Sequence, residues 1–269
     1  MPDNERMSET DAVPVVELPG DARMPMVGFG TWKVTGDQVA GAVAAALATG
    51  YRHIDTATMY GNEAEIGAAL GASGLDRAEV FVTTKIRPPD AGREPEVLRR
   101  SLRALRTEYV DLWLVHWASQ RPWRRTEIWN DMRKLRDEGL VRAIGVSNYS
   151  LAQIDELIES TGETPAVNQI RWGPSYYDPD VVVGHKARGI ALEGYSGLKD
   201  SQLKDPALAE IAAAHQVTVP QVVLRWHLEH GITVIPKSVR PDRIAANFDL
   251  LSFALSQAEV ARIDALGNL

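Results

Sequence analysis

Short apolar runs of strand length alternate with longer segments of helical period along nearly the whole sequence. Eight of the runs predict buried strands, and these are Val27–Trp32, Tyr51–Asp55, Val80–Lys85, Val110–His116, Ala143–Ser147, Ala166–Gln169, Ile190–Tyr195 and Ile232–Pro236. Two earlier segments, Val13–Leu18 and Arg23–Pro25, predict a short N-terminal β-hairpin. A strand followed by a helix, repeated eight times, closes most naturally as a parallel (β/α)8 TIM barrel, with a doubly wound sheet as the alternative.

The segments between the strands carry signals for the beginning and end of helices. Pro95 suits a first helical turn, and Gly139 suits a helix end. Further start signals are the capping boxes of Ser150 with Gln153 and Ser256 with Glu259, and the caps Asp178 and Asp205, each before a proline. The second capping box predicts a C-terminal helix.

The length of 269 residues allows one large domain or two small ones, because α/β barrels of about 250 residues fold as single units. Hydrophobic residues make up 45% of the chain, and no apolar run approaches the roughly 18 residues of a membrane span. The N-terminus lacks the apolar core of a secretory signal. We therefore expect a flexible tail over residues 1–12, with Met1 or Met7 as the start, and one barrel domain over residues 13–269.

Charge and cysteine content narrow the functional classes. Without cysteine the chain has no disulfide, no thiolate metal site and no cysteine nucleophile, and this composition fits a reducing cytoplasm. The formal net charge of −7 disfavours general nucleic-acid binding, which depends on positive charge that neutralises phosphates. We expect a cytoplasmic protein with a small-molecule partner and no metal, nucleic-acid or membrane partner.

Polar side chains stand at the carboxyl ends of the predicted strands. They are Asp55, Lys85, His116, Ser147 with Asn148, Gln169, Tyr195 and Lys237. Each alone has an ordinary structural explanation, such as a helix cap for Asp55 or a hydrogen-bonded core histidine for His116. Together they indicate an active site, because in a parallel barrel these strand ends converge on the face that carries the catalytic loops.

Several motifs resemble, in order and spacing, the signatures of the aldo-keto reductase superfamily. They are Tyr51–Ala57 with Tyr60–Glu63, Val115–Trp117, Ile144–Asn148 and Ile235–Val239, supported by Gly28–Lys33, Arg243 and Asn247. The resemblance covers about residues 13–266. The short loops and the Ala-Val-Asn-Gln segment after a Thr-Pro pair are most similar to the bacterial 2,5-diketo-gluconate reductase type.

The resemblance implies a catalytic tetrad of Asp55, Tyr60, Lys85 and His116. Hydride reduction of a carbonyl places negative charge on oxygen, so a proton donor must lie within reach of that atom. The Tyr60 phenol is the expected donor, and we expect the Lys85 ammonium to lower its pKa. Asp55 is expected to keep Lys85 charged, and His116 to orient the carbonyl as a neutral imidazole. The structural alternative is a buried Asp–Lys pair beside a hydrogen-bonded tyrosine.

A nicotinamide cofactor cannot be held in the Rossmann manner, because the sequence has no Gly-x-Gly-x-x-Gly turn. By resemblance, Ser147, Asn148 and Gln169 bind the carboxamide of the nicotinamide, and Tyr195 stacks on its ring. Ser196, Leu198 and the stretch to Lys204 are expected to lie over the pyrophosphate, and Thr31 is a further expected contact.

A basic cluster surrounds Pro241, which is a suitable first residue of a helix. The cluster contains Lys237, Ser238, Val239, Arg240 and Arg243, with Asn247 close behind. Cationic side chains and free backbone donors at a helix start suit an anion, although a solvated basic face is the common alternative. The resemblance assigns the cluster to the adenosine phosphate, so the expected cofactor is NADPH.

Departures from the family pattern lie mainly on the substrate side. They are Ala118 in place of a proline, Arg171-Trp172-Gly173 in place of Glu-Leu-His, and Ala246 in place of an acidic adenine contact. Arg171 either attracts a carboxylate or points to solvent. The expected substrate-binding residues are Trp32 and Trp117, with Trp123, Trp172 and Met59 as further candidates for an aromatic-lined pocket.

The sequence thus predicts a monomeric, NADPH-dependent oxidoreductase of the class that acts on CH–OH donors, reducing aldehydes or ketones to alcohols. Two other classes stay open. One is an NADPH-binding regulatory module of the same fold with little turnover. The other is a barrel lyase in which Lys85 forms a Schiff base.

Overall fold

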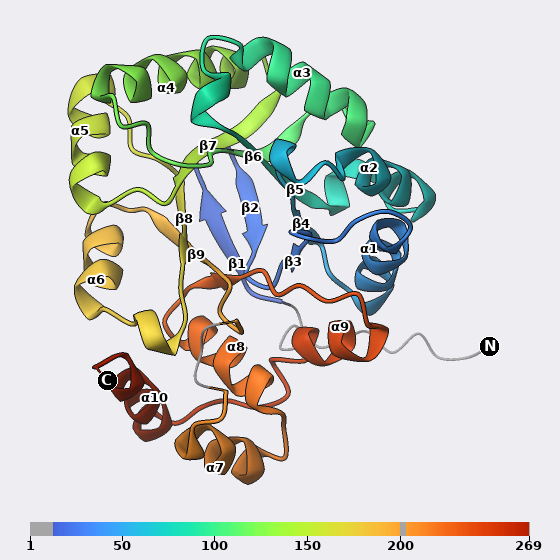
Figure 1. Cartoon of the computed structure of the whole chain (residues 1–269), viewed down its shortest axis with the longest axis vertical. Helices are drawn as coiled ribbons and strands as arrows, with labels where there is room; N and C mark the ends of the chain where they lie inside the picture. Colours follow the sequence, from blue (N-terminus) through green and yellow to red (C-terminus); the bar gives the residue numbers. More distant parts are fainter. Residues whose placement is uncertain (1–12, 200–202, 269) are drawn as a thin grey trace.

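Strands that are buried on both faces account for the centre of the molecule. All residues of β5 (Phe81–Ile86) and β6 (Val110–Val115) are buried, as expected for parallel strands covered by helices. The structure is a computed structural model that describes residues 13–199 and 203–268, and the predicted tail over residues 1–12 lies outside them. Figure 1 shows the strands at the centre and the helices around them.

In the described chain, eight parallel strands form the central sheet, and each pairs with the next along the sequence. Val27 bridges Val234 in parallel, and the Gly28 amide donates to the Val234 carbonyl at 2.7 Å, so the first and last strands close the ring. The predicted barrel is confirmed, and the doubly wound alternative is wrong. Besides β5 and β6, the strands are β3 (Phe29–Gly30), β4 (His53–Asp55), β7 (Val141–Ser147), β8 (Val167–Arg171), β9 (Ala191–Tyr195) and β10 (Thr233–Val234).

The seam of the barrel is shorter than the sequence predicts. The first strand of the barrel is expected over Val27–Trp32, but regular strand pairing covers only β3. The last is expected over Ile232–Pro236, but regular pairing covers only β10. Pro236 has no amide hydrogen to donate. The two chains also approach closely, because a Cβ at Gly30 would lie 2.6 Å from the Ile235 carbonyl oxygen. The seam is therefore held by few bonds, among them the bond from the Gly30 amide to the Pro236 carbonyl at 3.1 Å.

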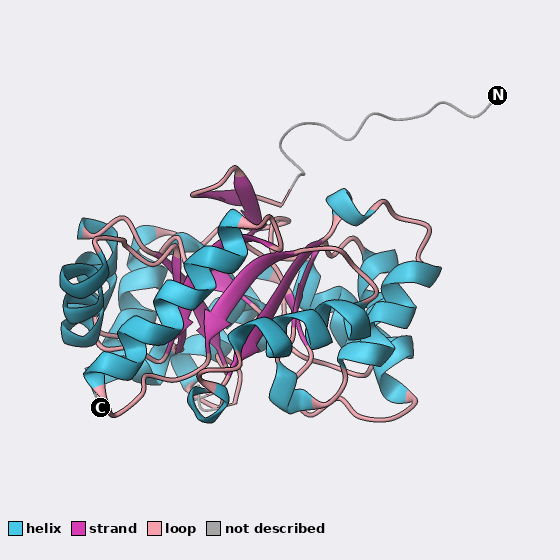
Figure 2. Ribbon diagram, turned by 90° about the horizontal axis from the view of Figure 1, so that it is seen from above, coloured by secondary structure: helices cyan, strands magenta, loops and turns pink. Residues whose placement is uncertain are grey.

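An antiparallel hairpin covers the amino-terminal end of the barrel (Figure 2). Its strands are β1 (Val15–Leu18), which is shorter than the predicted arm, and β2 (Ala22–Pro25), which is one residue longer. Its buried residues, such as Met24, pack against Phe81 and Leu112 inside the ring. The opposite, carboxyl end of the strands stays open.

The helices begin and end close to the predicted signals. Both predicted capping boxes form, at Ser150 and Ser256, and the Asp178 and Asp205 side chains accept from amides two residues on. The α-helices are α1 (Gln38–Thr49), α2 (Glu63–Ala72), α3 (Glu94–Leu105), α4 (Pro122–Asp137), α5 (Leu151–Thr161), α6 (Pro179–Ala187), α7 (Pro206–His215), α8 (Val219–Glu229), α9 (Pro241–Phe248) and the predicted C-terminal helix α10 (Gln257–Asp264). Short 3-10 turns are η2 (Thr58–Tyr60), η3 (Arg77–Glu79), η4 (Pro88–Asp90), η5 (Pro174–Tyr176) and η6 (Ala265–Asn268).

The apolar interior divides into two large clusters. One is built mainly from α1 to α5 and the strands they cover, and it includes Trp113 and Trp129. The other is built from α7, α8 and α10 and includes Trp172 and Trp226. Among the described helices, none alone is long and apolar enough to cross a membrane, although α7 and α8 together reach that length and composition as a pair bent by 89°.

Candidate active site

A cleft of about 630 Å³ opens at the carboxyl end of the barrel, where the sequence predicts the active site. Its lining comes mainly from the last residues of the strands and from the loops that follow them, with Leu224 and His227 of α8, so the barrel brings together side chains that are far apart in sequence. The predicted site residues in the lining are Trp32, Asp55, Tyr60, His116, Trp117, Asn148, Gln169, Tyr195, Ser196, Leu198 and Lys237.

A buried ion pair adjoins the cleft. Lys85 on β5 donates to both carboxylate oxygens of Asp55 on β4, at 2.8 and 2.7 Å, and to the Thr56 carbonyl at 2.8 Å. Burial by itself lowers the pKa of Lys85, but the Asp55 carboxylate and its hydrogen bonds more than offset this, and the pKa is raised. Lys85 therefore stays an ammonium, as the sequence predicts.

Tyr60 lies on η2, directly after β4, and faces both this pair and His116. Lys85 Nζ is 5.2 Å from the centre of the Tyr60 ring, and the His116 ring centre is 5.9 Å away from it. Burial raises the pKa of the Tyr60 phenol more than the Lys85 charge lowers it. The Lys85 charge does lower this pKa, as the sequence predicts, but desolvation outweighs the ammonium, and the phenol keeps its proton.

His116, which follows β6, is a neutral imidazole. Burial first, and then the positive charges of Lys85 and Arg87, lower its pKa to about 3. The ring stacks on Trp117 with 3.8 Å between centres. Its Nδ1 is buried and has no hydrogen-bond partner among the described residues, so Nε2 is the nitrogen that can act on a group in the cleft. The predicted neutral state of His116 is confirmed.

Hydrogen bonds join the predicted amide-binding residues into one group. Ser147 Oγ donates to the backbone carbonyl of Gln169 at 2.8 Å, and Asn148 Nδ2 donates to Ser147 Oγ at 3.0 Å. The Tyr195 hydroxyl donates to Asn148 Oδ1 at 2.7 Å. Asn148, Gln169 and Tyr195 line the cleft, whereas Ser147 is fully buried and supports them from behind.

Three residues of the cleft have a left-handed backbone that non-glycine residues rarely adopt. The angle φ is +61° at Lys33, +59° at Asn148 and +59° at Ser196. Each lies in the loop that follows a strand, namely β3, β7 or β9. Such positions cost of order 1–3 kcal/mol and gather at functional sites. They therefore mark this end of the barrel independently of the tetrad.

The other predicted cofactor residues lie beside the cleft. Thr31 is buried, and its hydroxyl donates to the Asp55 carbonyl at 2.8 Å, so its side chain holds β3 to β4 and does not line the cleft. Arg240 pairs with Asp242 at 2.8 Å, which partly neutralises it. Pro241 is the first residue of α9, as predicted. Lys237, Val239 and Arg243 continue the cluster from the cleft along the surface, whereas Ser238 and Asn247 are buried.

Large apolar side chains form the rim on the side of Tyr60. Trp32, Met59 and Trp117 are 42%, 44% and 41% exposed, and all three line the cleft. Arg171 also lines it, and its guanidinium lies over the Tyr176 ring at 4.5 Å. The rim is therefore apolar on one side and cationic on another.

Two further aromatic candidates are wrong. Trp172 is buried in the outer helical layer, where its ring lies parallel to that of Trp226 at 6.5 Å, because its side chain points away from the barrel axis. Trp123 is not part of the cleft lining, and it lies beside Arg124 at the start of α4.

Sequence reasoning missed Glu193 and Lys33, whereas Lys199 belongs to the predicted pyrophosphate stretch to Lys204, of which residues 200–202 lie outside the described residues. The two lysines line the cleft. Glu193 lies inside the barrel and is fully buried. A signal for it exists, because it is a single charged residue within the apolar run Ile190–Tyr195, and the two-residue period of a strand places it on the same face as Tyr195.

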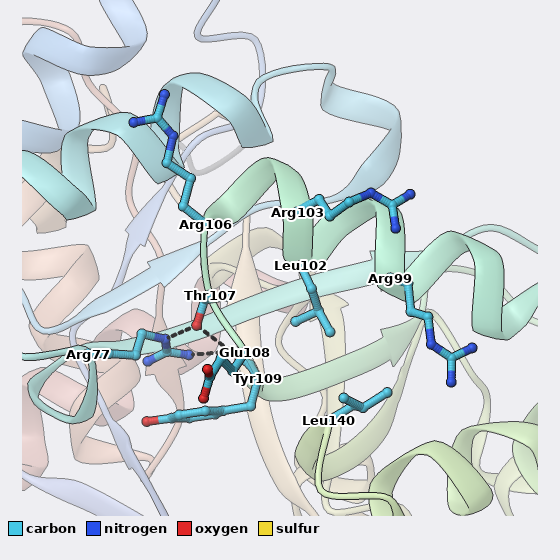
Figure 3. A pocket seen from close by; sticks show the side chains of 9 residues that line it. All are labelled: Arg77, Arg99, Leu102, Arg103, Arg106, Thr107, Glu108, Tyr109 and Leu140. Atoms are coloured by element: carbon cyan, nitrogen blue, oxygen red, sulfur yellow. Dashed lines mark hydrogen bonds between the residues drawn. The ribbon is translucent and has the colours of Figure 1, made fainter.

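A second hollow lies before the first residues of β5, β6 and β7, at the opposite end of the barrel, and is lined by Arg77, Arg99, Arg103 and Arg106 among others (Figure 3). Figure 3 shows that the guanidinium groups of Arg99, Arg103 and Arg106 point away from one another. Arg77 is held by Asp111 at 2.7 Å. Since these charges do not converge on one point, the cleft at the carboxyl end remains the candidate site.

Comparison with known proteins agrees with this geometry. The model of the Aldo/keto reductase family matches residues 26–268. The chain belongs to the aldo/keto reductase family. This aldo-keto reductase is 41% identical to the morphine 6-dehydrogenase of Pseudomonas putida, over 94% of this chain and 91% of that protein. It is also 41% identical to an aldo-keto reductase of Mycobacterium tuberculosis, over 96% and 92% of the two chains.

Solved structures show the same fold. An aldo/keto reductase from Brucella melitensis superposes with a TM-score of 0.91 at 42% identity, covering 95% of this chain and 100% of that one. The aldo-keto reductase of Bombyx mori in complex with NADP gives 0.88 at 33% identity, covering 96% and 94%. The expected superfamily is thus confirmed, and this aldo-keto reductase is an oxidoreductase.

Proposed function

We propose that this aldo-keto reductase reduces aldehydes or ketones to alcohols with NADPH, and that Tyr60 is the general acid. The observation that carries the proposal is the grouping of a protonated Tyr60, the buried Lys85–Asp55 pair and a neutral His116 at one cleft. NADPH, when bound, supplies the hydride. The same residues run the reverse oxidation of CH–OH donors.

The chain's own residues manage the proton and the charge on oxygen. Tyr60 and His116 Nε2 are the hydrogen-bond donors for the carbonyl oxygen. As negative charge develops there, Tyr60 gives up its proton, and the Lys85 ammonium stabilises the phenolate that forms. Asp55 keeps Lys85 charged through two short hydrogen bonds.

The amide side of the cleft fits a nicotinamide carboxamide. Both amide hydrogens of Gln169 are used, because its Nε2 donates to Asp55 Oδ2 at 2.8 Å and to Glu193 Oε2 at 2.7 Å. Its Oε1 is therefore the atom that can accept from a carboxamide. The Tyr195 ring in the wall suits stacking on the nicotinamide, and Ser196 and Leu198 suit the pyrophosphate side.

A preference for NADPH over NADH follows from the basic cluster. Arg243 on α9 is exposed, and no hydrogen bond or ion pair with another described residue engages its guanidinium. Lys237 lies between the cleft and this helix. Two cations that reach one anion suit a 2′-phosphate. The NADP complex of the Bombyx mori relative supports the same cofactor.

The apolar rim favours planar or bulky carbonyl substrates. Trp32, Met59 and Trp117 offer flat or flexible apolar surface next to Tyr60. The Pseudomonas putida relative is named for a dehydrogenase acting on morphine, which fits such a rim. The closer likeness to the 2,5-diketo-gluconate reductase type stays a prediction. So do the monomeric state, for which the closed barrel with no free strand edge is the argument, and the cytoplasmic location.

The experiment that tests this function is Tyr60→Phe. Loss of the proton donor is expected to lower kcat about a hundredfold or more, while the retained ring leaves the Kd for NADPH within about threefold. NADPH oxidation is measured against aldehydes, α-keto esters, diketones and keto-sugars, and the Kd by quenching of tryptophan fluorescence. Tyr109→Phe, at the opposite end of the barrel, is the matched control and keeps full activity.

Two outcomes would overturn the proposal. Tyr60→Phe that still turns over within a few fold of the unaltered protein shows that another group is the acid. NADPH binding by the unaltered protein without turnover of any carbonyl in the panel favours the regulatory module.

A further inference from the structure

Glu193 is a buried carboxyl group that the mechanism above does not use. It lies in the middle of β9, with its side chain fully buried in the barrel. In the sheet it is in register with Gln169 on β8 and with Thr233 on β10. Tyr195, two residues further along the same strand, lines the cleft. Glu193 therefore occupies the layer directly beneath the cofactor side of the site.

A single amide connects this carboxyl to the tetrad. Gln169 Nε2 donates one hydrogen to Glu193 Oε2 at 2.7 Å and the other to Asp55 Oδ2 at 2.8 Å. Asp55 Oδ2 also accepts from Lys85 at 2.7 Å. Two carboxyl groups thus hold the Gln169 side chain from both sides, and its carbonyl oxygen cannot exchange places with its nitrogen without facing both of them.

The second oxygen of Glu193 has no donor among the described residues. His53 Nε2 lies 3.6 Å from it. His53 Nδ1 must donate to the Pro25 carbonyl at 3.1 Å, because a carbonyl oxygen only accepts. In the neutral ring, Nε2 therefore carries a lone pair, and it accepts from Thr83 Oγ1 at 3.1 Å. A negative charge on Glu193 Oε1 would therefore face a lone pair. A proton on that oxygen removes the conflict.

The ionisable groups around Glu193 come from several elements. They are His53 and Asp55 on β4, Lys85 on β5, Tyr60 on η2 and, behind β9, His227 on α8. The only cation in this set, Lys85, is already bonded to Asp55. Burial first, and then the Asp55 charge, raise the pKa of Glu193 to about 8. The charge of Glu193, once formed, also raises the pKa of Tyr60.

We propose that Glu193 is a positioning residue which, as a neutral carboxylic acid, locks the Gln169 amide in the orientation that accepts the nicotinamide carboxamide, and which weakens Tyr60 as an acid when it ionises. The inference rests on the proposed function. It adds a second effect of pH, because the reduction should slow where Glu193 loses its proton, well before Tyr60 itself does.

The experiment compares Glu193→Gln, Glu193→Leu and the control Thr233→Val. Gln keeps an oxygen that accepts from Gln169 but cannot ionise, whereas Leu removes the acceptor. Thr233 lies in the same layer, and its hydroxyl has no described partner, so Thr233→Val tests for general effects of repacking. The measurements are the Kd for NADPH by fluorescence quenching and the pH dependence of kcat/KM for reduction between about pH 6 and pH 10.

In the unaltered protein, kcat/KM is expected to fall about threefold or more through pH 8, ahead of any loss due to Tyr60. Glu193→Gln should abolish this limb and keep the Kd within about threefold, whereas Glu193→Leu should raise the Kd about tenfold because Gln169 is released. Thr233→Val should show the limb unchanged. The same limb in Glu193→Gln, or an unchanged Kd in Glu193→Leu, would overturn the proposal.

A direct readout separates this proposal from the function on which it rests. Infrared difference spectra of the unaltered protein on raising the pH should show loss of a carboxylic C=O band near pH 8 that is missing in Glu193→Gln. This measurement needs no substrate, so it keeps its meaning even if no carbonyl is reduced. A difference spectrum without that band shows that Glu193 does not change its protonation state over this range and contradicts the proposal, whereas absence of turnover contradicts only the function.

Discussion

Burial decides which side chains of this protein carry charge. In the described chain, His53, His116, His185 and His227 are buried, and desolvation is the first cause that lowers the pKa of each. A histidine in the unfolded chain has a pKa near 6.5. Below that value the unfolded state takes up protons that the folded state refuses, so stability is lost as the pH falls.

His227 on α8 offers a test of this acid sensitivity. Its Nδ1 donates to the Val223 carbonyl at 2.7 Å, and burial lowers its pKa to about 4. Between pH 8 and pH 5 it should therefore cost the fold about 2 kcal/mol. His227→Gln is expected to lose about that much less stability over the same interval. Urea unfolding at the two pH values measures it, and equal losses in both proteins would show that another group dominates.

The candidate site was partly readable from single residues. Asp55, Lys85 and His116 end apolar runs, and the barrel rule puts such residues on one face. Two features were not readable. The net direction of the pKa shift of Tyr60 depends on a balance between burial and the Lys85 charge, which only the packed site sets. Glu193 stands out as a charged residue within an apolar run, but its hydrogen bond with Gln169, which is 24 residues away, does not follow from local pattern.

For helices and strands, the sequence predicts which elements form better than it predicts where each begins and ends. All eight strands and both capping boxes appear where local patterns place them, because hydrophobic period and cap chemistry act within a few residues. The bounds of β3 and β10 do not follow from local pattern. They depend on the close approach of two chain segments about 200 residues apart at the seam of the barrel.

A pair of glycine substitutions tests that seam. Gly30→Ala places a methyl group 2.6 Å from the Ile235 carbonyl oxygen and is expected to cost about 1–3 kcal/mol, as overpacking does. Gly41→Ala on α1 is the matched control, because nothing lies within 4 Å of the added methyl group. The better helix propensity of alanine there should add about 1 kcal/mol of stability. Chemical unfolding of the two variants measures both changes in the free energy of unfolding. An unchanged free energy of unfolding in Gly30→Ala would mean that the backbone at the seam moves to accommodate the methyl group.

At the scale of the whole molecule, the cleft joins the two apolar clusters. Asp55 and His116 follow Ile54 and Val115 of the first cluster, whereas Tyr195 ends β9, whose Leu192 belongs to the second cluster. A ligand that contacts both sets of residues opposes separation of the two clusters. The net charge of −7 does not prevent binding of an anion, because Lys33, Lys199 and Lys237 line this cleft and Arg243 lies nearby on α9.

Binding of the cofactor should therefore stabilise the entire fold. NADPH at about a hundred times its Kd is expected to add about 2.7 kcal/mol, which raises the Tm by about 5–10 °C in a chain of this size. NADH at the same concentration should give a smaller shift, since it has no 2′-phosphate for Arg243. Arg243→Ala should reduce the Tm shift by NADPH to that by NADH. The control is Arg262→Ala on α10, which removes only the ion pair with Glu210 and should leave both shifts unaltered. Equal shifts by the two cofactors in the unaltered protein would mean that the basic cluster is only a solvated surface.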